Sequence, residues 1–212
     1  MGKGKVLTGA TMSLDGYISG LGESGFDLLF RWYGDGDVVV KTADPALTFH
    51  LTPENAAVWR DLVSRTGALV VGRHLFDITN GWNGRHPMDV PVFVVTHRPP
   101  AEWQEEHPGA PFTFVTEGVP AAIAQAKDAA GPKDVSVAAG SIGSQALEAG
   151  LVDEVGITLA PVVLGGGRTF FQALGRAPYA FGDPEVVTAR GVTHLRYPIA
   201  RRRRKADAAP GS

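Results

Sequence analysis

Three short apolar segments along the chain end at small or basic residues. They lie at residues 68–71 (ALVV), 90–95 (VPVFVV) and 134–138 (DVSVA). Apolar runs of this kind are typical of strands buried on both faces, as in a parallel sheet with helices on each side. Segments 119–130 and 144–150 have helical patterns next to the third run. The alternation of strands and helices predicts an α/β fold with a mostly parallel central sheet.

A further helix is predicted from residue 53 up to Gly67. Thr52 is a good N-cap residue, and Pro53 stands at the first helical position, where its missing N–H costs nothing. The segment before this helix, about residues 20–50, is loop-like at its start and carries bulky residues with helical spacing at 26–33. We interpret it as an insertion that lies over a core.

Strands are also predicted at both ends of the chain. Residues 5–10 (KVLTGA) form a first strand, which the turn signal Asp15-Gly16 follows. Residues 153–163, 185–190 and 192–199 are strand-like and are separated by hairpin-length connections. The sheet is therefore expected to finish with an antiparallel edge.

Length and charge divide the chain into a body and a tail. With 212 residues and no linker before residue 200, a single domain is expected over residues 1–200. The net charge is −2, but five of the 20 basic residues lie at 201–205; without residues 201–212 the body has 15 basic and 21 acidic residues. We expect a flexible basic tail and no nucleic-acid surface on the acidic body, which leaves nucleic-acid binding by the tail as a separate hypothesis.

Composition excludes several kinds of site. There are no cysteines, so disulfides, thiolate nucleophiles and cysteine-ligated metals are absent, and the six histidines show no paired metal spacing. No metal is predicted. The longest uncharged apolar stretch, around 155–167, is too short to span a membrane, and the N-terminus has no signal-peptide pattern. The protein is expected to be cytoplasmic.

The ends of the buried strands carry residues that suit an anionic ligand. At the carboxyl ends of parallel strands, helix N-termini present free N–H groups toward a crevice. Three such ends supply glycine, hydroxyl or guanidinium groups, and a ligand with several phosphates would suit them together: Gly72 and Arg73; Thr96 and Arg98; and Gly140, Ser141, Ile142, Gly143 and Ser144. The alternative is that each is an ordinary strand-to-helix turn. The common dinucleotide and P-loop glycine motifs are absent, which disfavours a Rossmann dehydrogenase or a P-loop ATPase.

Asp15 is the candidate acid. It follows the first strand within Ser13-Leu14-Asp15-Gly16-Tyr17. A carboxyl group in a pocket could deliver a proton or bind the N–H groups of a ligand. The alternative is an Asp-Gly turn in which the carboxylate bonds the local backbone.

These segments, in this order, resemble the dihydrofolate reductase-like superfamily, in the branch related to the reductase domain of bacterial riboflavin biosynthesis, the RibD C-terminal domain. The resemblance covers most of residues 4–199. It is carried by TMSLDGYISG (11–20), ALVVGRHLFD (68–77), PVFVVTHRP (91–99), the long stretch from KDVSVAAGSIGS to PVVLGGGRTFF (133–171) and GVTHLRYPI (191–199).

The resemblance implies an NADPH-dependent reductase with the dinucleotide across the carboxyl edge of the sheet. By analogy, Gly72, Arg73, Thr96 and Arg98 would hold the adenine-side phosphates, Gly140 to Ser144 the pyrophosphate, and Gly9 and Ala10 would border the nicotinamide. Two guanidinium groups near the 2′-phosphate would favour NADPH over NADH, because charge-assisted hydrogen bonds are the stronger ones.

The implied reaction is hydride transfer to a C=N or C=O carbon of a small, pteridine- or pyrimidine-like substrate. Asp15 would orient the substrate or assist proton delivery, and Leu75 and Trp82 would form pocket walls. Similar proteins imply a homodimer formed through the sheet edge. Ala139 stands where the family has glycine, and Leu75 where many relatives have threonine. A catalytically silent NADP(H)-binding or regulatory protein and a deazaflavin cofactor in place of NADPH remain alternatives.

Overall fold

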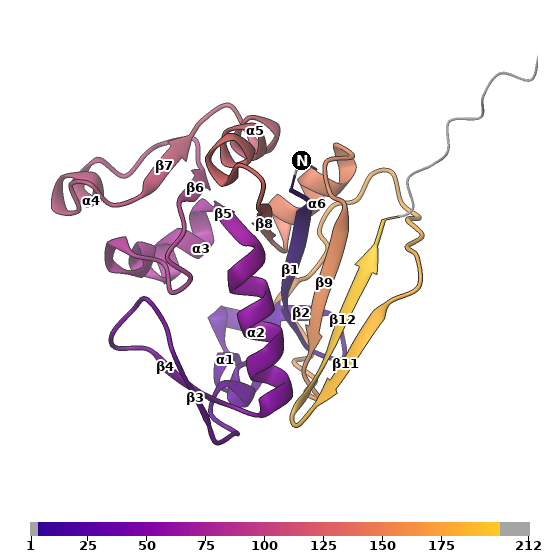
Figure 1. Ribbon diagram of the computed structural model, residues 1–212. Coiled ribbons are helices and arrows are strands. Elements are labelled where there is room, and N and C mark those ends of the chain that lie inside the picture. Colours follow the sequence, from indigo (N-terminus) through magenta and orange to yellow (C-terminus); the bar gives the residue numbers. More distant parts are fainter. Residues whose placement is uncertain (1–3, 200–212) are drawn as a thin grey trace, which may run out of the picture.

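Eight strands form the central sheet of the structure, a computed structural model that describes residues 4–199 (Figure 1). The strands are β1 (Val6–Met12), β5 (Thr66–Gly72), β6 (Val92–Val95), β7 (Phe112–Val115), β8 (Asp134–Ala138), β9 (Glu154–Leu159), β11 (Glu185–Ala189) and β12 (Val192–Pro198). Their order across the sheet is β11-β12-β9-β1-β8-β5-β6-β7. The six strands from β9 to β7 are parallel, whereas β12 runs antiparallel to β9 and β11 antiparallel to β12. The predicted fold class, with its antiparallel C-terminal edge, is confirmed.

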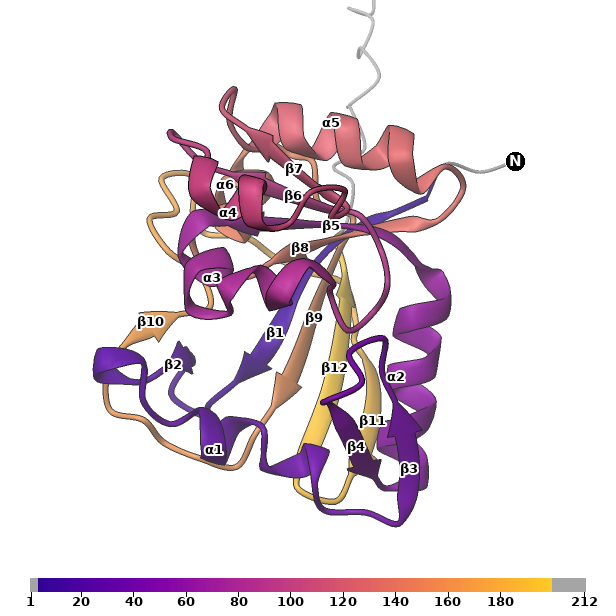
Figure 2. The same cartoon turned by 90° about the vertical axis from the view of Figure 1, so that its left-hand side faces the viewer.

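Helices cover both faces of this sheet, as Figure 2 shows for the β5–β8 side. They are α2 (Pro53–Arg65), α3 (Arg73–Ile78), α4 (Ala101–Glu106), α5 (Val119–Ala130) and α6 (Ser141–Glu148). In β5, Ala68 and Val70 belong to the core under α5 and α6, while Leu69 and Val71 belong to the core under α2, α3 and α4. Because alternate residues of a strand point to opposite faces, a strand with both faces buried is apolar throughout.

Gly67 has a different role from the one predicted. The helix that Thr52 caps, with its hydroxyl accepting a hydrogen bond from Asn55 N at 3.3 Å, ends at Arg65, and β5 begins at the next residue. A Cβ on Gly67 would lie 2.8 Å from the Cβ of Ala130. The glycine therefore allows β5 to approach the end of α5, and it lies within the strand.

The region before α2 contains more structure than the pattern predicted. The bulky segment forms only the short helix α1 (Phe26–Leu29) and the 3-10 turn η2 (Arg31–Tyr33). Two strand pairs accompany it: the hairpin of β3 (Val38–Lys41) and β4 (Thr48–Leu51), and β2 (Tyr17–Ser19) with β10 (Arg168–Thr169). These strands have two to four residues, too few to show a clear period. β7 was not predicted, and α6 begins at residue 141 instead of 144.

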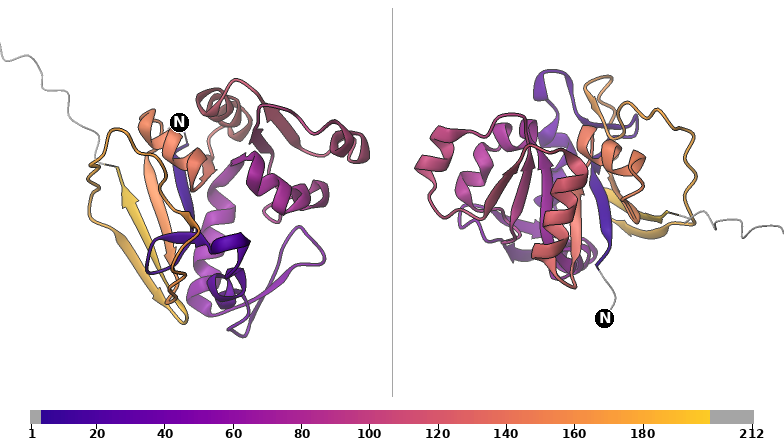
Figure 3. Two further views of the ribbon diagram at one scale, coloured as in Figure 1. Left: turned by 180° about the vertical axis from the view of Figure 1, so that it is seen from behind. Right: turned by 90° about the horizontal axis from the view of Figure 1, so that it is seen from above.

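The 20–50 region has its own apolar cluster. Leu29, Trp32, Phe49 and Leu51 are buried together and reach Ala160, just beyond β9. In Figures 1 and 3 the β3–β4 hairpin and α1 lie at the same end of the molecule as the turn between β11 and β12. This region therefore closes one end of the space between the sheet and α2.

Two further expectations concern the basic tail and a membrane span. The basic run at 201–205 and the tail at 201–212 lie outside the described residues. Among the helices of residues 4–199, none has the length and apolar character needed to cross a membrane.

Candidate active site

A cavity of about 910 Å³ lies on the face of the sheet that α2 and α3 cover. Alternate residues of neighbouring strands form its floor, and the strand register sets them in three rows across the sheet. The rows are Ser136, Leu7 and Glu154; then Ala138, Gly9, Gly156, Arg196 and Glu185; then Thr11, Thr158, His194 and Val187. On β1 and β9, polar side chains thus lie at both ends of the floor, with Gly9 and Gly156 between them.

Two adjacent glycines form the middle of this floor. Gly9 of β1 and Gly156 of β9 are register partners. A Cβ on Gly9 would lie 2.9 Å from the carbonyl oxygen of Gly156, whereas a Cβ on Gly156 would meet nothing closer than Thr8 O at 4.0 Å. The bare strands leave room for a flat ring to lie against the sheet.

The predicted phosphate-binding residues of β5 and β6 come together at the carboxyl ends of these strands. Arg73 opens α3, its Nε bonds Asp77 Oδ1 at 2.7 Å, and its Nη1 donates to the carbonyl of Arg98 at 2.6 Å. The Thr96 hydroxyl donates to the same carbonyl at 3.0 Å. Gly72 and Arg73 line the cavity, whereas Thr96 and the exposed Arg98 lie next to Arg73 and outside it.

The turn before α6 faces the cavity with its first residues. Gly140 has φ +83, a conformation that favours glycine, and its N–H donates to Phe170 O at 2.8 Å. It lines the cavity together with Ser141 and Ile142. A Cβ on Gly72 would lie 2.9 Å from the Cγ1 of Ile142, so the two predicted anion sites flank the same narrow part of the cavity.

Gly143 and Ser144 hold α6 in place and do not line the cavity. A side chain on Gly143 would collide with the Thr8 hydroxyl, so glycine allows the helix to pack on β1. The Ser144 hydroxyl accepts a hydrogen bond from Gln172 N at 2.8 Å. These two members of the predicted pyrophosphate site therefore lie behind it.

Asp15 lies outside the cavity. Its carboxylate accepts hydrogen bonds from the Ser13 hydroxyl at 2.6 Å and from the backbone N–H groups of Leu164 and Gly165 at 3.1 and 2.7 Å. The hydrogen bond from Ser13, with those from the backbone, holds the pKa of Asp15 below its usual value. This geometry fits the turn interpretation: the carboxylate ties the turn after β1 to the Leu164–Gly165 loop.

Leu75 and Trp82 both line the cavity, beside α3. Trp82 adopts φ +48 within a short 3-10 segment at Asn80–Gly84, and its ring meets the edge of His86 at 4.5 Å between centroids. Burial lowers the pKa of His86 to about 4, so this ring is neutral at pH 7. The part of the wall formed by Leu75, Trp82 and His86 is consequently uncharged.

The structure adds an aromatic wall that the sequence interpretation missed. It comes from the 20–50 region and from α2, and consists of Phe26, Phe30, Trp32, Tyr33 and Trp59. Tyr33 and Trp59 are 6.3 Å apart between ring centroids, at 79°. The helical spacing of bulky residues at 26–33 led to the interpretation of an insertion over a core; only the tertiary structure shows that these rings face a cavity.

His194 is a second cavity residue that was not predicted. Its Nε2 lies 2.8 Å from Asn55 Oδ1, and its Nδ1 lies 3.0 Å from the Thr158 hydroxyl. The amide oxygen of Asn55 can only accept, so Nε2 carries the hydrogen and Nδ1 accepts one from Thr158. Burial lowers the pKa of His194 to about 4, which keeps the ring neutral at pH 7.

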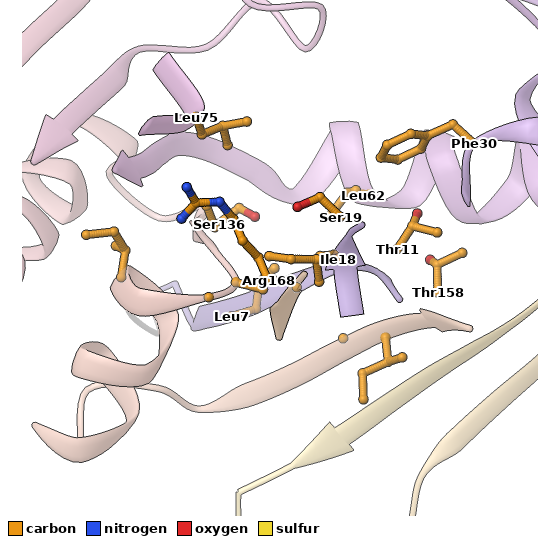
Figure 4. A pocket seen from close by; sticks show the side chains of 18 of the residues that line it. Leu7, Thr11, Ile18, Ser19, Phe30, Leu62, Leu75, Ser136, Thr158 and Arg168 are labelled. Atoms are coloured by element: carbon orange, nitrogen blue, oxygen red, sulfur yellow. The ribbon is translucent and has the colours of Figure 1, made fainter. Parts of the chain in front are cut away.

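An ion-paired cluster closes the rim near α3. Glu23 Oε1 lies 2.8 Å from Arg168 Nε and 2.8 Å from His74 Nε2, and all three residues line the cavity. Burial raises the pKa of Glu23, but its hydrogen bond and charge interaction with Arg168 and His74 outweigh this and leave it lowered. In Figure 4, Leu75 and Arg168 lie at one side of the cavity and Phe30, Thr11 and Thr158 at the other.

The α/β sheet with its antiparallel edge is similar in fold to dihydrofolate reductase. The chain belongs to the RibD C-terminal domain family, whose sequence model matches residues 4–180. The search of curated proteins finds no match to this chain.

Three solved structures show the extent of the similarity. A protein from Shewanella sp. PV-4 assigned to riboflavin biosynthesis has 23% identity and a TM-score of 0.69, with coverage of 93% of this chain and 99% of its own. Dihydrofolate reductase from Enterococcus faecalis, in complex with NADP(H), has 15% identity and a TM-score of 0.55, with coverage of 92% and 96%. The deaminase/5-amino-6-(5-phosphoribosylamino)uracil reductase of Thermotoga maritima has 11% identity and a TM-score of 0.60, with coverage of 93% and 57%. Family membership supports an oxidoreductase.

Proposed function

We propose that this protein is an NADPH-dependent reductase that transfers a hydride to a C=N or C=O carbon of a small planar substrate, such as a pteridine- or pyrimidine-like ring. The observation that carries this proposal is the continuity of the cavity from Gly72 and Arg73, across the Gly9–Gly156 floor, to the aromatic wall. Its volume of about 910 Å³ is at the upper end of the usual range for ligand pockets. Two ligands can therefore meet above the glycines.

The residues present fit a dinucleotide. Gly72 and Gly9 line the cavity and carry no side chain, so the backbone is bare where a ligand would pass. Arg73 is a cation fixed by Asp77 and Arg98 O, and the backbone at Ser141 and Ile142 opens α6, a helix of eight residues. Free N–H groups at a helix N-terminus favour an anion. When bound, the cofactor would supply the hydride.

The chain's own residues would bind and orient the two ligands. The Gly9–Gly156 floor would hold a ring flat against β1 and β9, and Phe30 and Trp59 would pack on the substrate side. The Thr158 hydroxyl directs its hydrogen to His194, so its oxygen is left as an acceptor toward the cavity. Most of the rate enhancement would come from this positioning, since the cofactor carries the hydride.

A titration with both nicotinamide cofactors tests the proposal. Arg73→Ala and Arg98→Ala should weaken NADPH binding about tenfold or more and NADH binding much less, because the guanidinium groups would meet the 2′-phosphate. Arg85→Ala serves as the control, since Arg85 is an exposed residue paired with Asp89 outside this cavity. Equal losses for both cofactors would count against the 2′-phosphate assignment.

Oxidation of NADPH distinguishes the reductase from a silent binding protein. A panel of carbonyl, imine and pteridine compounds should yield turnover with at least one of them. Saturable NADPH binding without any oxidation would favour the binding or regulatory alternative. Binding of a deazaflavin by a protein that ignores NADPH would favour the other cofactor.

We also propose a homodimer formed through the sheet edge. β11 is the outer strand of the described sheet, and 54% of Val186 is exposed. An exposed apolar edge strand offers unpaired N–H and C=O groups to a second chain. This proposal concerns assembly alone.

A further inference from the structure

The charged end of the cavity lies at the start of β9. Glu154 lies four residues before Thr158 on the same face, so the two are about 13 Å apart along the strand. The side chain of Glu154 is only 7% exposed. Arg65 at the end of α2 and Arg196 of β12 also line the cavity here. This end is therefore the place where a charged substituent of a substrate would have to be accommodated.

The cations at this end are already paired. Glu154 contacts three of them: Lys5 Nζ at 3.2 Å, Arg196 Nε at 3.3 Å and Arg65 Nη2 at 3.5 Å. Arg65 also pairs with Asp134 at 3.0 Å and Asp61 at 3.6 Å, and Arg196 pairs with Asp61 at 2.9 Å and Glu185 at 3.4 Å. The cluster formed by these residues, called the Glu154 cluster below, contains three cations and four carboxylates: Lys5, Arg65, Arg196, Asp61, Asp134, Glu154 and Glu185.

The net charge of the Glu154 cluster is therefore −1, from +3 and −4, and its four members that line the cavity, Arg65, Arg196, Glu154 and Glu185, sum to zero. A phosphate group carries roughly −1.5 to −2 at neutral pH, so it would meet no excess of positive charge to balance it. Drawing Arg65 or Arg196 toward a phosphate would leave the buried Glu154 carboxylate with fewer partners, and an unpaired buried charge is strongly unfavourable. This end of the cavity consequently disfavours an anionic substituent.

The remaining polar groups on the substrate side are neutral. Thr11 and Thr158 present hydroxyl groups on the floor, and the two side chains lie together in Figure 4. His194 is neutral at pH 7 because burial lowers its pKa to about 4. Phe30 and Trp59 supply apolar ring faces above them. Neutral hydrogen-bonding groups between aromatic faces suit a flat ring without formal charge.

We infer that the substrate of this reductase is an uncharged planar ring compound without a phosphate or carboxylate group. The inference rests on the proposed function, because it places the substrate over the glycine floor, with the Glu154 cluster at one end and Thr11 and Thr158 at the other. It separates this chain from a reductase that acts on a phosphorylated ring.

Binding of two matched pterins tests the inference. 6-Hydroxymethylpterin and pterin-6-carboxylate are both fluorescent and differ by one negative charge at the same position. The titrations are done at neutral pH without NADPH, in the wild-type protein and in the Arg73→Ala variant. The variant lacks the Arg73 cation, which could otherwise attract the carboxylate. The uncharged pterin should bind at least about tenfold more tightly, which corresponds to ~1.4 kcal/mol. Equal or tighter binding of the carboxylate, or failure of the uncharged pterin to bind at all, would overturn the inference.

Variants of the Glu154 cluster assign the preference to this end of the cavity. Glu154→Gln should shift the affinity ratio toward the carboxylate by about tenfold, because it removes the shared partner of Arg65 and Arg196. Glu185→Gln should shift the ratio in the same direction and keeps the test available if Glu154→Gln does not fold, since Glu185 is 76% exposed. Glu105→Gln, an equal charge change at an exposed residue of α4, should leave the ratio unchanged. Unshifted ratios in folded variants of the cluster would refute its role.

The two proposals can fail separately. A protein that prefers the uncharged pterin but does not bind NADPH would count against the proposed function. A protein that binds NADPH but shows no preference between the pterins would overturn the inference alone.

Discussion

Gly156→Ala separates the stability of the sheet from the binding surface that the sheet presents. The new Cβ would meet nothing closer than Thr8 O at 4.0 Å, and Gly156 has no positive φ. Replacing glycine where the backbone suits alanine stabilises a protein by about 0.4–1 kcal/mol through the unfolded chain. The free energy of unfolding should therefore stay the same or rise by up to ~1 kcal/mol.

The same methyl group would stand on the floor of the cavity, beside Gly9. A ring that lies flat there would be displaced by about 1 Å or more, and an error of ~1 Å can cost about 10²-fold in rate. In an apolar pocket, one extra methylene group changes discrimination by about 1–3 kcal/mol, or roughly 10–200-fold. We expect the affinities for NADPH and 6-hydroxymethylpterin to fall by about tenfold or more.

Two measurements check this expectation on the same protein. Urea unfolding gives the change in stability, and fluorescence titration gives the dissociation constants. Gly34→Ala is the matched control, because its Cβ would make only an ordinary contact of 3.7 Å at an exposed position outside the cavity. A folded Gly156→Ala protein that binds both ligands within twofold of the wild type would refute the glycine floor as the binding surface.

Four further outcomes follow from the structure. Gly9→Ala should lower the free energy of unfolding by about 1–3 kcal/mol, since its Cβ would lie 2.9 Å from Gly156 O; a protein as stable as the wild type in urea would contradict this contact. His194 has a pKa of about 4 in the folded protein and 6.5 in the unfolded chain, so the unfolded chain binds more protons between these values. The free energy of unfolding should therefore fall by about 2 kcal/mol from this group between pH 7 and pH 5. His194→Gln should reduce this pH dependence, measured by urea unfolding. Asp15→Ala should lower the melting temperature with no change in the NADPH dissociation constant, whereas a tenfold weaker constant at unchanged melting temperature would restore a role in the site. Val186→Lys should convert a dimer to a monomer in analytical ultracentrifugation, and an unchanged mass would exclude this edge as the interface.

Local patterns were sufficient for the long, regular elements. The helix at 119–130 and the strand at 134–138 have the predicted bounds, because each has a run of apolar or helical spacing long enough to define its period. Strands β3 and β4 of the 20–50 region have four residues each and owe their conformation to pairing with each other and to the cluster around Trp32 and Phe49. No period can be read from segments of that length.

The candidate site was predicted in part for a similar reason. Gly72, Arg73 and Gly140 follow buried strands, and the topology of a parallel sheet brings such strand ends to one edge. Asp15 also follows a strand, but its carboxylate is directed to the Leu164–Gly165 loop, about 150 residues along the chain. A pattern within one segment carries no information on such a distant partner.

The sequence by itself determined the α/β class, the mostly parallel sheet and strand-end residues that line the cavity, such as Gly72, Arg73 and Gly140, because these depend on local periodicity and on the direction of each strand. The tertiary structure alone decided the rest of the cavity. Gly9 and Gly156 become a floor only through the register of β1 with β9, and Arg65, Glu154 and Arg196 form one charged cluster only because α2, β9 and β12 pack together. Contacts between residues about 150 positions apart, such as Lys5 with Glu154, are fixed by packing of the whole domain, so no local pattern encodes them.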